Sequence, residues 1–334
     1  MIKSFLKNHS IHKVVASKLD MFFILRPSLY FAVWVMVLVG MFLARLDNEM
    51  DIVWINVFNL RTFVVFFGFT CISSSCFILN LLSDQDSDAL NSKNLVLGLE
   101  GIKERKVLQI QKILLGIGVS SLVLANWYLS LLGILLYVFW GVLYSVGRFH
   151  WKKRLLHGII SNFVAGLLFM LSGYLVVLSD FSLFENFNIK IFFISILPYL
   201  FFYTSISLMT MIPDIKGDVS TGSSTFPIVF GSKITSFVSF VLIALGVLVG
   251  FFNQDPISST AGIISIPFYF YAIFRHLNKD IIRAIRYPIF LLNFFICVVY
   301  PMASIFLIIN FYLCKYYYWH RFDLHYPTFL VDDD

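Results

Sequence analysis

The segment Phe77–Asn91, "FILNLLSDQDSDALN", begins as apolar, membrane-like sequence and ends in a row of carboxylates. Asn80, Asp84 and Asp88 are spaced by four, so on a helix their side chains share one face. Like charges at this spacing repel, and an ionised carboxylate at the end of an apolar helix needs compensation. The segment therefore predicts a membrane helix whose end presents carboxylates to a cation. A solvated helix end with no further role is the alternative.

The composition of the whole chain agrees with a membrane protein. Of its 334 residues, 59% are hydrophobic and only 13% are charged, whereas soluble domains carry about 25% charged residues. The net charge of +6 comes from basic residues in short loops between apolar runs, which follows an orientation rule and argues against nucleic-acid binding. We expect an all-α, multi-pass protein in the lipid bilayer.

Long apolar runs predict nine transmembrane helices bundled around a central cavity, because a spanning helix needs about 20 mostly apolar residues. The predicted spans are roughly 23–44, 62–82, 107–125, 127–147, 157–178, 191–212, 234–252, 259–275 and 287–311. No linker divides the chain, so we expect a single domain over 1–334. Within it, 1–22 is expected to form an interfacial helix and 312–334 a C-terminal tail.

Lys and Arg concentrate on one side of this predicted bundle. They lie in the N-terminal segment and in the loops 83–106, 148–156, 213–233 and 276–286. Cytoplasmic loops of membrane proteins carry such an excess, so the N-terminus is expected to be cytoplasmic. Nine spans then place the C-terminus on the opposite side, and cap loops with the acidic site on the cytoplasmic side.

A second acidic segment lies on the same predicted side of the membrane. In "MTMIPDIKGDVSTGSSTFPIVFG", Met209–Gly231, Asp214 and Asp218 are again four apart, just after Pro213 at the end of an apolar run. Mg²⁺ is held by one or two carboxylates together with substrate phosphates. Two facing pairs of carboxylates predict a site in which Mg²⁺ neutralises a diphosphate. An ordinary polar loop remains the alternative for the Gly/Ser/Thr part.

A basic segment lies between the two acidic ones. "LYSVGRFHWKKRLLHG", Leu143–Gly158, places Tyr144 four residues before Arg148, and Lys152 and Lys153 follow. Cations beside a diphosphate are expected, and Arg makes bidentate contacts with phosphate, although cytoplasmic loops are basic in any case. The substrate-binding candidates are Asn80, Asn91, Tyr144, Arg148, Lys152 and Lys153, and the candidate catalytic and metal ligands are Asp84, Asp88, Asp214 and Asp218.

At these residues the sequence resembles the UbiA superfamily of intramembrane prenyltransferases. The family's first motif, NDxxDxxxD, is matched at Asn80, Asp84 and Asp88, with Leu81 replacing the second-position Asp. Its second motif, DxxxD, often extends to DxEGDxxxGxxT-x-P. The matches there are Asp214, Gly217, Asp218, Gly222, Thr225 and Pro227, with Lys216 replacing the acidic residue.

Two shorter elements add to the resemblance. The family's Tyr-x-x-x-Lys/Arg element matches Tyr144 and Arg148, and Leu25–Pro27, "LRP", looks like the Arg-Pro that enters its first span. The loop after the first motif lacks the family's Arg-Pro-x-x-x-Gly and has Lys93 as its nearest cation. The resemblance implies Mg²⁺-dependent transfer of a prenyl chain from an isoprenoid diphosphate donor to a lipophilic acceptor, an aromatic compound, quinone precursor or lipid.

Two other classes of membrane protein compete with this interpretation. A transporter with an acidic ion site would carry its carboxylates near the bilayer midplane, often on broken helices, whereas here they lie at the ends of predicted spans. Another Mg²⁺-dependent lipid-phosphate transferase, of the CDP-alcohol type, uses a longer single motif that begins with Asp-Gly, which the sequence lacks. We therefore favour prenyl transfer and leave the acceptor and the donor length open.

Overall fold

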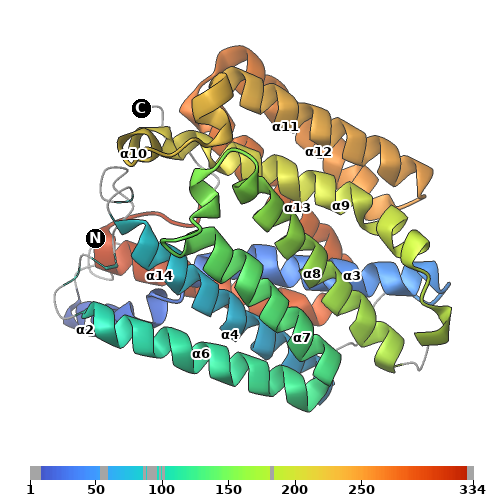
Figure 1. Cartoon of the computed structure of the whole chain (residues 1–334), viewed down its shortest axis with the longest axis horizontal. Coiled ribbons are helices and arrows are strands. Elements are labelled where there is room, and N and C mark those ends of the chain that lie inside the picture. Colours follow the sequence, from blue (N-terminus) through green and yellow to red (C-terminus); the bar gives the residue numbers. More distant parts are fainter. Residues whose placement is uncertain are drawn as a thin grey trace.

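The computed structural model describes residues 9–52, 59–85, 88, 96–97, 99, 102–180 and 184–328, and all regular structure in these residues is helical. The long helices are α3 Tyr30–Asp47, α4 Leu60–Ser83, α6 Glu104–Ala125, α7 Trp127–Leu136, α8 His157–Asp180, α9 Ile189–Thr210, α11 Phe226–Phe252, α12 Pro256–Arg275, α13 Asn278–Val299 and α14 Pro301–Phe322. Shorter elements are α2 Ser10–Phe23 and α10 Ile215–Ser220 (Figure 1).

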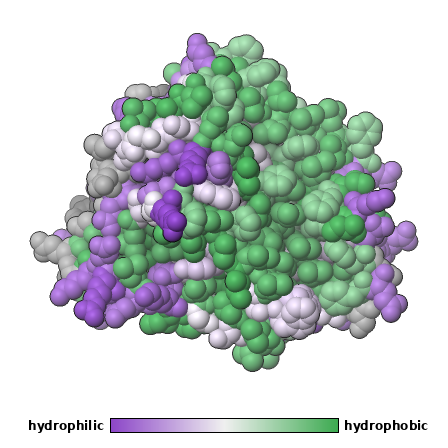
Figure 2. Space-filling model, in the orientation of Figure 1, coloured by the Kyte–Doolittle hydropathy of each residue, from purple (hydrophilic) through white to green (hydrophobic). Residues whose placement is uncertain are grey.

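The surface of the bundle is that of a membrane protein. Within the described residues, eight helices are long and apolar enough to cross a bilayer, and the shorter apolar segment Trp127–Leu143 adds a further candidate. Large apolar side chains such as Leu124 and Phe252 are more than four-fifths exposed, which lipid tolerates and water penalises. Figure 2 shows a hydrophobic surface across the middle of the molecule, with hydrophilic residues gathered toward its two ends. The prediction of a multi-pass, all-α membrane protein with about nine spans is confirmed.

The core is built around the crossing of α3 and α8. A Cβ atom added to Gly40 would lie 1.9 Å from the carbonyl oxygen of Met170, and one added to Gly173 would lie 1.9 Å from that of Val37. The two backbones therefore touch at this crossing, as small residues allow in membrane helices. Buried residues of α4, α9 and α13 pack around this pair and complete the main apolar core.

The last predicted span is wrong in detail. In place of one helix over 287–311, α13 ends at Val299 and α14 begins at Pro301, because Tyr300 is not helical and Pro starts the new helix. The segment 312–334, predicted as a tail, is helical as far as Phe322. α14 is 22 residues long, enough to traverse a bilayer at 1.5 Å per residue, although its composition keeps it outside the eight candidate spans.

This additional helix changes where the described chain ends. Arg286, near the start of α13, donates a hydrogen bond of 2.6 Å to the carbonyl of Thr328, and Arg321 pairs with Asp20 of α2. Both ends of the described chain therefore lie at the same end of the bundle (Figure 1). The expectation that the C-terminus lies opposite the N-terminus is incorrect, because α14 returns along the bundle.

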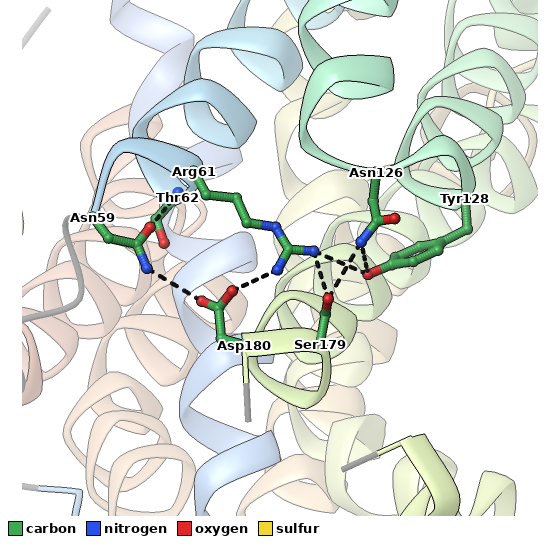
Figure 3. Close-up of polar contacts among 7 residues, drawn as sticks. All are labelled: Asn59, Arg61, Thr62, Asn126, Tyr128, Ser179 and Asp180. Atoms are coloured by element: carbon green, nitrogen blue, oxygen red, sulfur yellow. Dashed lines mark hydrogen bonds and ion pairs between the residues drawn. The ribbon is translucent and has the colours of Figure 1, made fainter. Parts of the chain in front are cut away.

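The other end of the bundle is closed by a polar network (Figure 3). Arg61, at the start of α4, pairs with Asp180 at the end of α8 at 2.7 Å, and also donates to the hydroxyls of Ser179 and Tyr128. Asn126, between α6 and α7, donates to the same Tyr128 hydroxyl. The network joins the ends of four helices and balances one cation against one carboxylate. We refer to it as the Arg61 network.

Candidate active site

The first acidic motif continues the helix that carries it. α4 ends at Ser83, yet the N–H of Asp84 donates to the carbonyl of Asn80 at 2.9 Å, and that of Asp88 donates to the carbonyl of Asp84 at 2.7 Å. These bonds keep the helical spacing of four beyond the end of α4, as expected for side chains that share a face. Ser83 fixes the end of the helix to the following loops, since its hydroxyl donates to the carbonyl of Ser145 and contacts His150.

The second acidic motif lies where α9 gives way to a short 3₁₀ turn, Ile212–Asp214, and then to α10. Pro213 occupies the first turn, where its missing N–H costs nothing. The side chain of Asp218 accepts a bond of 3.4 Å from the Thr225 hydroxyl, and its carbonyl accepts one from the N–H of Ser223. The intervening turn requires Gly222, whose φ is +68°. These contacts fold the polar loop back onto its own aspartate.

Both acidic motifs face one polar pocket of about 160 Å³. Its lining residues come from the segment before α3, the end of α4, the end of the π-helical stretch after α7, the 150–154 loop, α8, and the end of α9 with the α9–α11 connection. They are Arg26, Asn80, Asp84, Asp88, Tyr144, Lys152, Lys153, Asn162, Thr210, Met211, Asp214, Asp218, Thr221, Ser223 and Thr225. Sequence positions more than 120 residues apart thus meet at the end of the bundle where α2 and α14 lie.

Lys152 is a cation of this pocket with a largely buried side chain. Its ammonium group contacts the carboxylate of Asp84 and donates to the side-chain oxygen of Asn80 at 3.2 Å, and its side chain is only 9% exposed. Burial lowers the pKa of Lys152, while the carboxylates of Asp84 and Asp88 oppose that shift. The loop that carries it is fixed by a bond of 2.7 Å from the N–H of Ser224 to the carbonyl of Lys153. The basic loop therefore touches both acidic motifs.

Asn162 lines the pocket, and its hydrogen bonds to Trp140 and Ser207 form what we call the pocket floor. Asn162 accepts a bond of 2.9 Å from the Trp140 indole N–H and donates one of 2.8 Å to the Ser207 hydroxyl. Because the indole can only donate, the orientation of the Asn162 amide is determined. Trp140 lies in a π-helical stretch, Tyr137–Leu143, that continues α7 and ends beside Tyr144. π-helical turns occur often at functional sites.

Aromatic rings continue below this floor. Phe77 and Phe169 both pack edge-on against Trp140, with ring centroids 5.2 and 5.7 Å from it. These rings do not line the pocket themselves; they pack behind Asn162, which lines it and bonds Trp140. Aromatic side chains therefore lie next to the polar pocket on its core side.

The structure brings most of the predicted site residues together and leaves Arg148 outside the pocket. Arg148 is exposed and is not among the residues that line the pocket. Asn91 lies outside the described residues, so its predicted role is untested. For the residues that do line the pocket, convergence is established, and their roles in binding and catalysis stay predictions.

Arg26 lines the pocket but was not among the predicted site residues. It precedes Pro27 and adopts a left-handed conformation, with φ +54° and ψ +57°. A lone Arg before a helix has no periodic pattern that marks it, and the only signal for it in the sequence is the Arg-Pro pair at the entry to the first span.

The donor set of the pocket suits Mg²⁺. Among the described residues, no three His, Cys, Asp or Glu side chains form a ready-made ligand cluster, but Mg²⁺ keeps several waters and needs only one or two carboxylates with substrate phosphates. The ammonium of Lys152 already lies against Asn80 and Asp84 as a cation would. The oxygens of the first motif therefore point into the pocket and accept positive charge.

Solved structures with the same fold include two from Archaeoglobus fulgidus. A UbiA homologue has a TM-score of 0.62 and 17% identity, with 85% of this chain and 99% of that chain covered. The same kind of protein bound to GPP and Mg²⁺ has a TM-score of 0.63, 16% identity and the same coverage. A digeranylgeranylglyceryl phosphate synthase has a TM-score of 0.57 and 18% identity, with 85% and 97% covered.

The sequence itself decides the family. No curated protein matches the chain at the significance that these solved structures reach. A sequence model of the UbiA prenyltransferase family, however, matches residues 33–297, which include both acidic motifs and the basic loop between them. The matched region runs from α3 to α13 and leaves α2 and α14 outside. Over most of its length, therefore, this multi-pass membrane protein belongs to the UbiA prenyltransferase family and is an enzyme of the prenyltransferase class.

Proposed function

We propose that the chain transfers a prenyl group from an isoprenoid diphosphate to a lipophilic acceptor, with Mg²⁺, in the pocket between the two acidic motifs. The observation that carries the proposal is the convergence of Asp84, Asp88, Asp214 and Asp218 on one pocket that also holds three cations. A homologue solved with GPP and Mg²⁺ and another solved with DMAPP and Mg²⁺ agree with this donor class.

The charges that line the pocket favour a metal-bound diphosphate. Four carboxylates face Arg26, Lys152 and Lys153, so the lining carries one net negative charge. That charge does not attract a diphosphate alone. The carboxylates would hold Mg²⁺ through Asp84 and Asp88 on one side and Asp214 and Asp218 on the other, and bound Mg²⁺ would neutralise the leaving diphosphate. Two such ions and a trianionic diphosphate would make the filled pocket neutral.

The chain's own residues would act on the leaving group and on the tail. Lys152, released from Asp84 when that carboxylate turns to a metal, would donate to a diphosphate oxygen, and Arg26 and Lys153 would offset further charge. Tyr144 would donate a hydrogen bond from the floor. As the allylic C–O bond breaks, its electron pair passes to the diphosphate, so these donors bind more tightly as the reaction proceeds. The rings around Trp140 would shelter the allylic carbon and the hydrocarbon chain.

We expect the pocket to face the cytoplasm. Lys152 and Lys153 line the pocket, and Arg286 and the described basic residues of α2 lie at the same end of the bundle, where the positive-inside rule would place the cytoplasm. The acceptor would reach the allylic carbon from the membrane, since the middle of the surface seen in Figure 2 is apolar.

The test is turnover by the purified protein in lipid nanodiscs, with Mg²⁺, labelled prenyl diphosphates of several lengths and a panel of lipophilic acceptors. We expect a prenylated product that disappears when EDTA removes the metal and returns with added Mg²⁺. Release of diphosphate without prenylated product would indicate that the right acceptor is missing. Neither product nor diphosphate release with any donor, from folded protein, would contradict the proposal.

A further inference from the structure

Arg26 occupies the pocket in a backbone conformation that it does not favour. Non-glycine residues with positive φ cost free energy and persist only when their surroundings hold them. The backbone around Arg26 is fixed on both sides, since its N–H donates to the carbonyl of Phe23 at 3.1 Å and its carbonyl accepts from Leu29 at 2.9 Å. Those bonds define the turn but do not explain what keeps the turn against the bundle.

The contact that fixes the turn comes from the opposite end of the sequence. Asn310 of α14 donates a bond of 2.9 Å to the carbonyl of Pro27, the residue after Arg26, and both partners are buried. The same carbonyl accepts the backbone N–H of Tyr30 within the 3₁₀ turn, so the Asn310 amide is a second donor and ties the turn to α14. α14 therefore holds the residue that follows Arg26.

α14 also holds the helix that precedes Arg26. The buried carboxylate of Asp20 in α2 accepts bonds from the Tyr317 hydroxyl at 2.8 Å and from two nitrogens of Arg321 at 3.0 and 2.9 Å. The ring of Phe23 stacks on that of Tyr317, with centroids 3.6 Å apart. α14 thus contacts both sides of Arg26, through one hydrogen bond to Pro27, three to Asp20 and one ring stack on Phe23.

We propose that α14 is a positioning element that presents Arg26 to the anionic head of the substrate. The proposal rests on the proposed function, because it takes that head to be a diphosphate, for which the planar guanidinium offers two parallel donors. α2, Arg26 and α14 all lie outside residues 33–297, the region that the family model matches. The two ends of the chain thereby supply one cation of the pocket and the means of aiming it.

The test is a double-mutant cycle between Arg26→Ala and Asn310→Ala, read as the dissociation constant of inorganic diphosphate in the presence of Mg²⁺. This readout needs no acceptor and no turnover. We expect each single variant to weaken binding about tenfold, the range of one charge-assisted hydrogen bond. In the Arg26→Ala background, Asn310→Ala should add less than a twofold change, because the group that it positions is already gone.

The matched control is Ile309→Ala, a neighbouring α14 residue that is 59% exposed and should bind diphosphate like the wild type. If Asn310→Ala does not fold, Tyr317→Phe takes its place in the same cycle. The Tyr317→Phe change removes only the hydroxyl that bonds Asp20. Equal losses in both backgrounds, or no loss in folded protein, would overturn the proposal. Failure of the proposed function would look different, because the wild type would then bind no diphosphate.

Discussion

The two ends of the bundle both carry buried or half-buried charges, and they differ in how those charges are balanced. At one end, the Arg61 network sets one guanidinium against one carboxylate and fills the remaining positions with neutral donors and acceptors. At the other end, four carboxylates share a pocket with three cations. The first arrangement has no net charge, and the second has one negative charge in excess and still attracts a cation.

This difference separates a structural network from a binding site. A pair such as Arg61 and Asp180 gains little from an added ion, because each charge already has its partner. Carboxylates that face one another repel until a cation joins them. The excess of carboxylates therefore lowers the free energy of unfolding of the protein without a bound cation. A cation bound in the pocket should raise that free energy.

The largest expected effect comes from removing one pocket carboxylate. Asp218→Asn should lower Mg²⁺-dependent turnover by about 10²–10³-fold, the loss typical of one electrostatic contact to a leaving group. The matched change at the other end, Asp180→Asn, should leave turnover within twofold of the wild type. Initial rates at saturating donor and Mg²⁺ measure both. Similar losses for the two variants would mean that the two ends do not differ in function.

The next effect concerns Lys152, which would bind the diphosphate and would also compete with Mg²⁺ for Asp84. Lys152→Met should raise the KM for the prenyl diphosphate by about tenfold or more, because a buried charged donor is lost. The same change should lower the Mg²⁺ concentration for half-maximal rate, since the ammonium no longer competes for Asp84. Titrations of donor at fixed Mg²⁺, and of Mg²⁺ at fixed donor, give the two values. A rise in both would show that Lys152 assists the metal, and Lys152→Arg is the charge-retaining control.

A smaller effect is expected on the stability of the Arg61 network. Asp180→Asn should reduce the free energy of unfolding by about 1–2 kcal/mol, because the pair is partly exposed and neutral contacts remain. Thermal unfolding of the detergent-solubilised protein, followed by tryptophan fluorescence, provides the measurement. Added Mg²⁺ and diphosphate should not restore the loss. Restoration would indicate that the two ends are coupled.

The smallest expected effect concerns the attachment of α4 to the neighbouring loops. Ser83→Ala removes the bond to the Ser145 carbonyl and the contact with His150. We expect a loss of about 1 kcal/mol or less in stability and a rise in the donor KM of about two- to threefold, since Asp84 follows directly. Ser121→Ala, an exposed hydroxyl on α6 that bonds only its own helix, serves as the control and should change neither quantity.

The parts of the site that the sequence predicts are those set by local spacing. Asn80, Asp84 and Asp88 keep their helical register because consecutive backbone bonds carry it past the end of α4. Asp214 and Asp218 are similarly fixed by a 3₁₀ turn and a short helix. The spans follow from long apolar runs, so most helix positions were predictable. That the two motifs share a pocket follows only from how the helices pack.

The parts that the sequence leaves undecided depend on distant contacts. Arg26 enters the site through a turn whose conformation is held by α14, and nothing near residue 26 encodes that contact. The apolar run 287–311 spans the break at Tyr300, because hydropathy does not register a single non-helical residue. Among the basic residues, Lys152 lines the pocket and Arg148 is exposed, a distinction that charge alone does not make.

The glycine crossing of α3 and α8 has a consequence for how the enzyme accommodates tails of different length. With no side chain between the two backbones at Gly40 and Gly173, neither helix has slack to slide or roll past the other. The relative position of α3 and α8 is therefore fixed. Extra room for a longer hydrocarbon would then have to come from helices that do not pack on this crossing, so donor-length variants are best sought in α11 and α12.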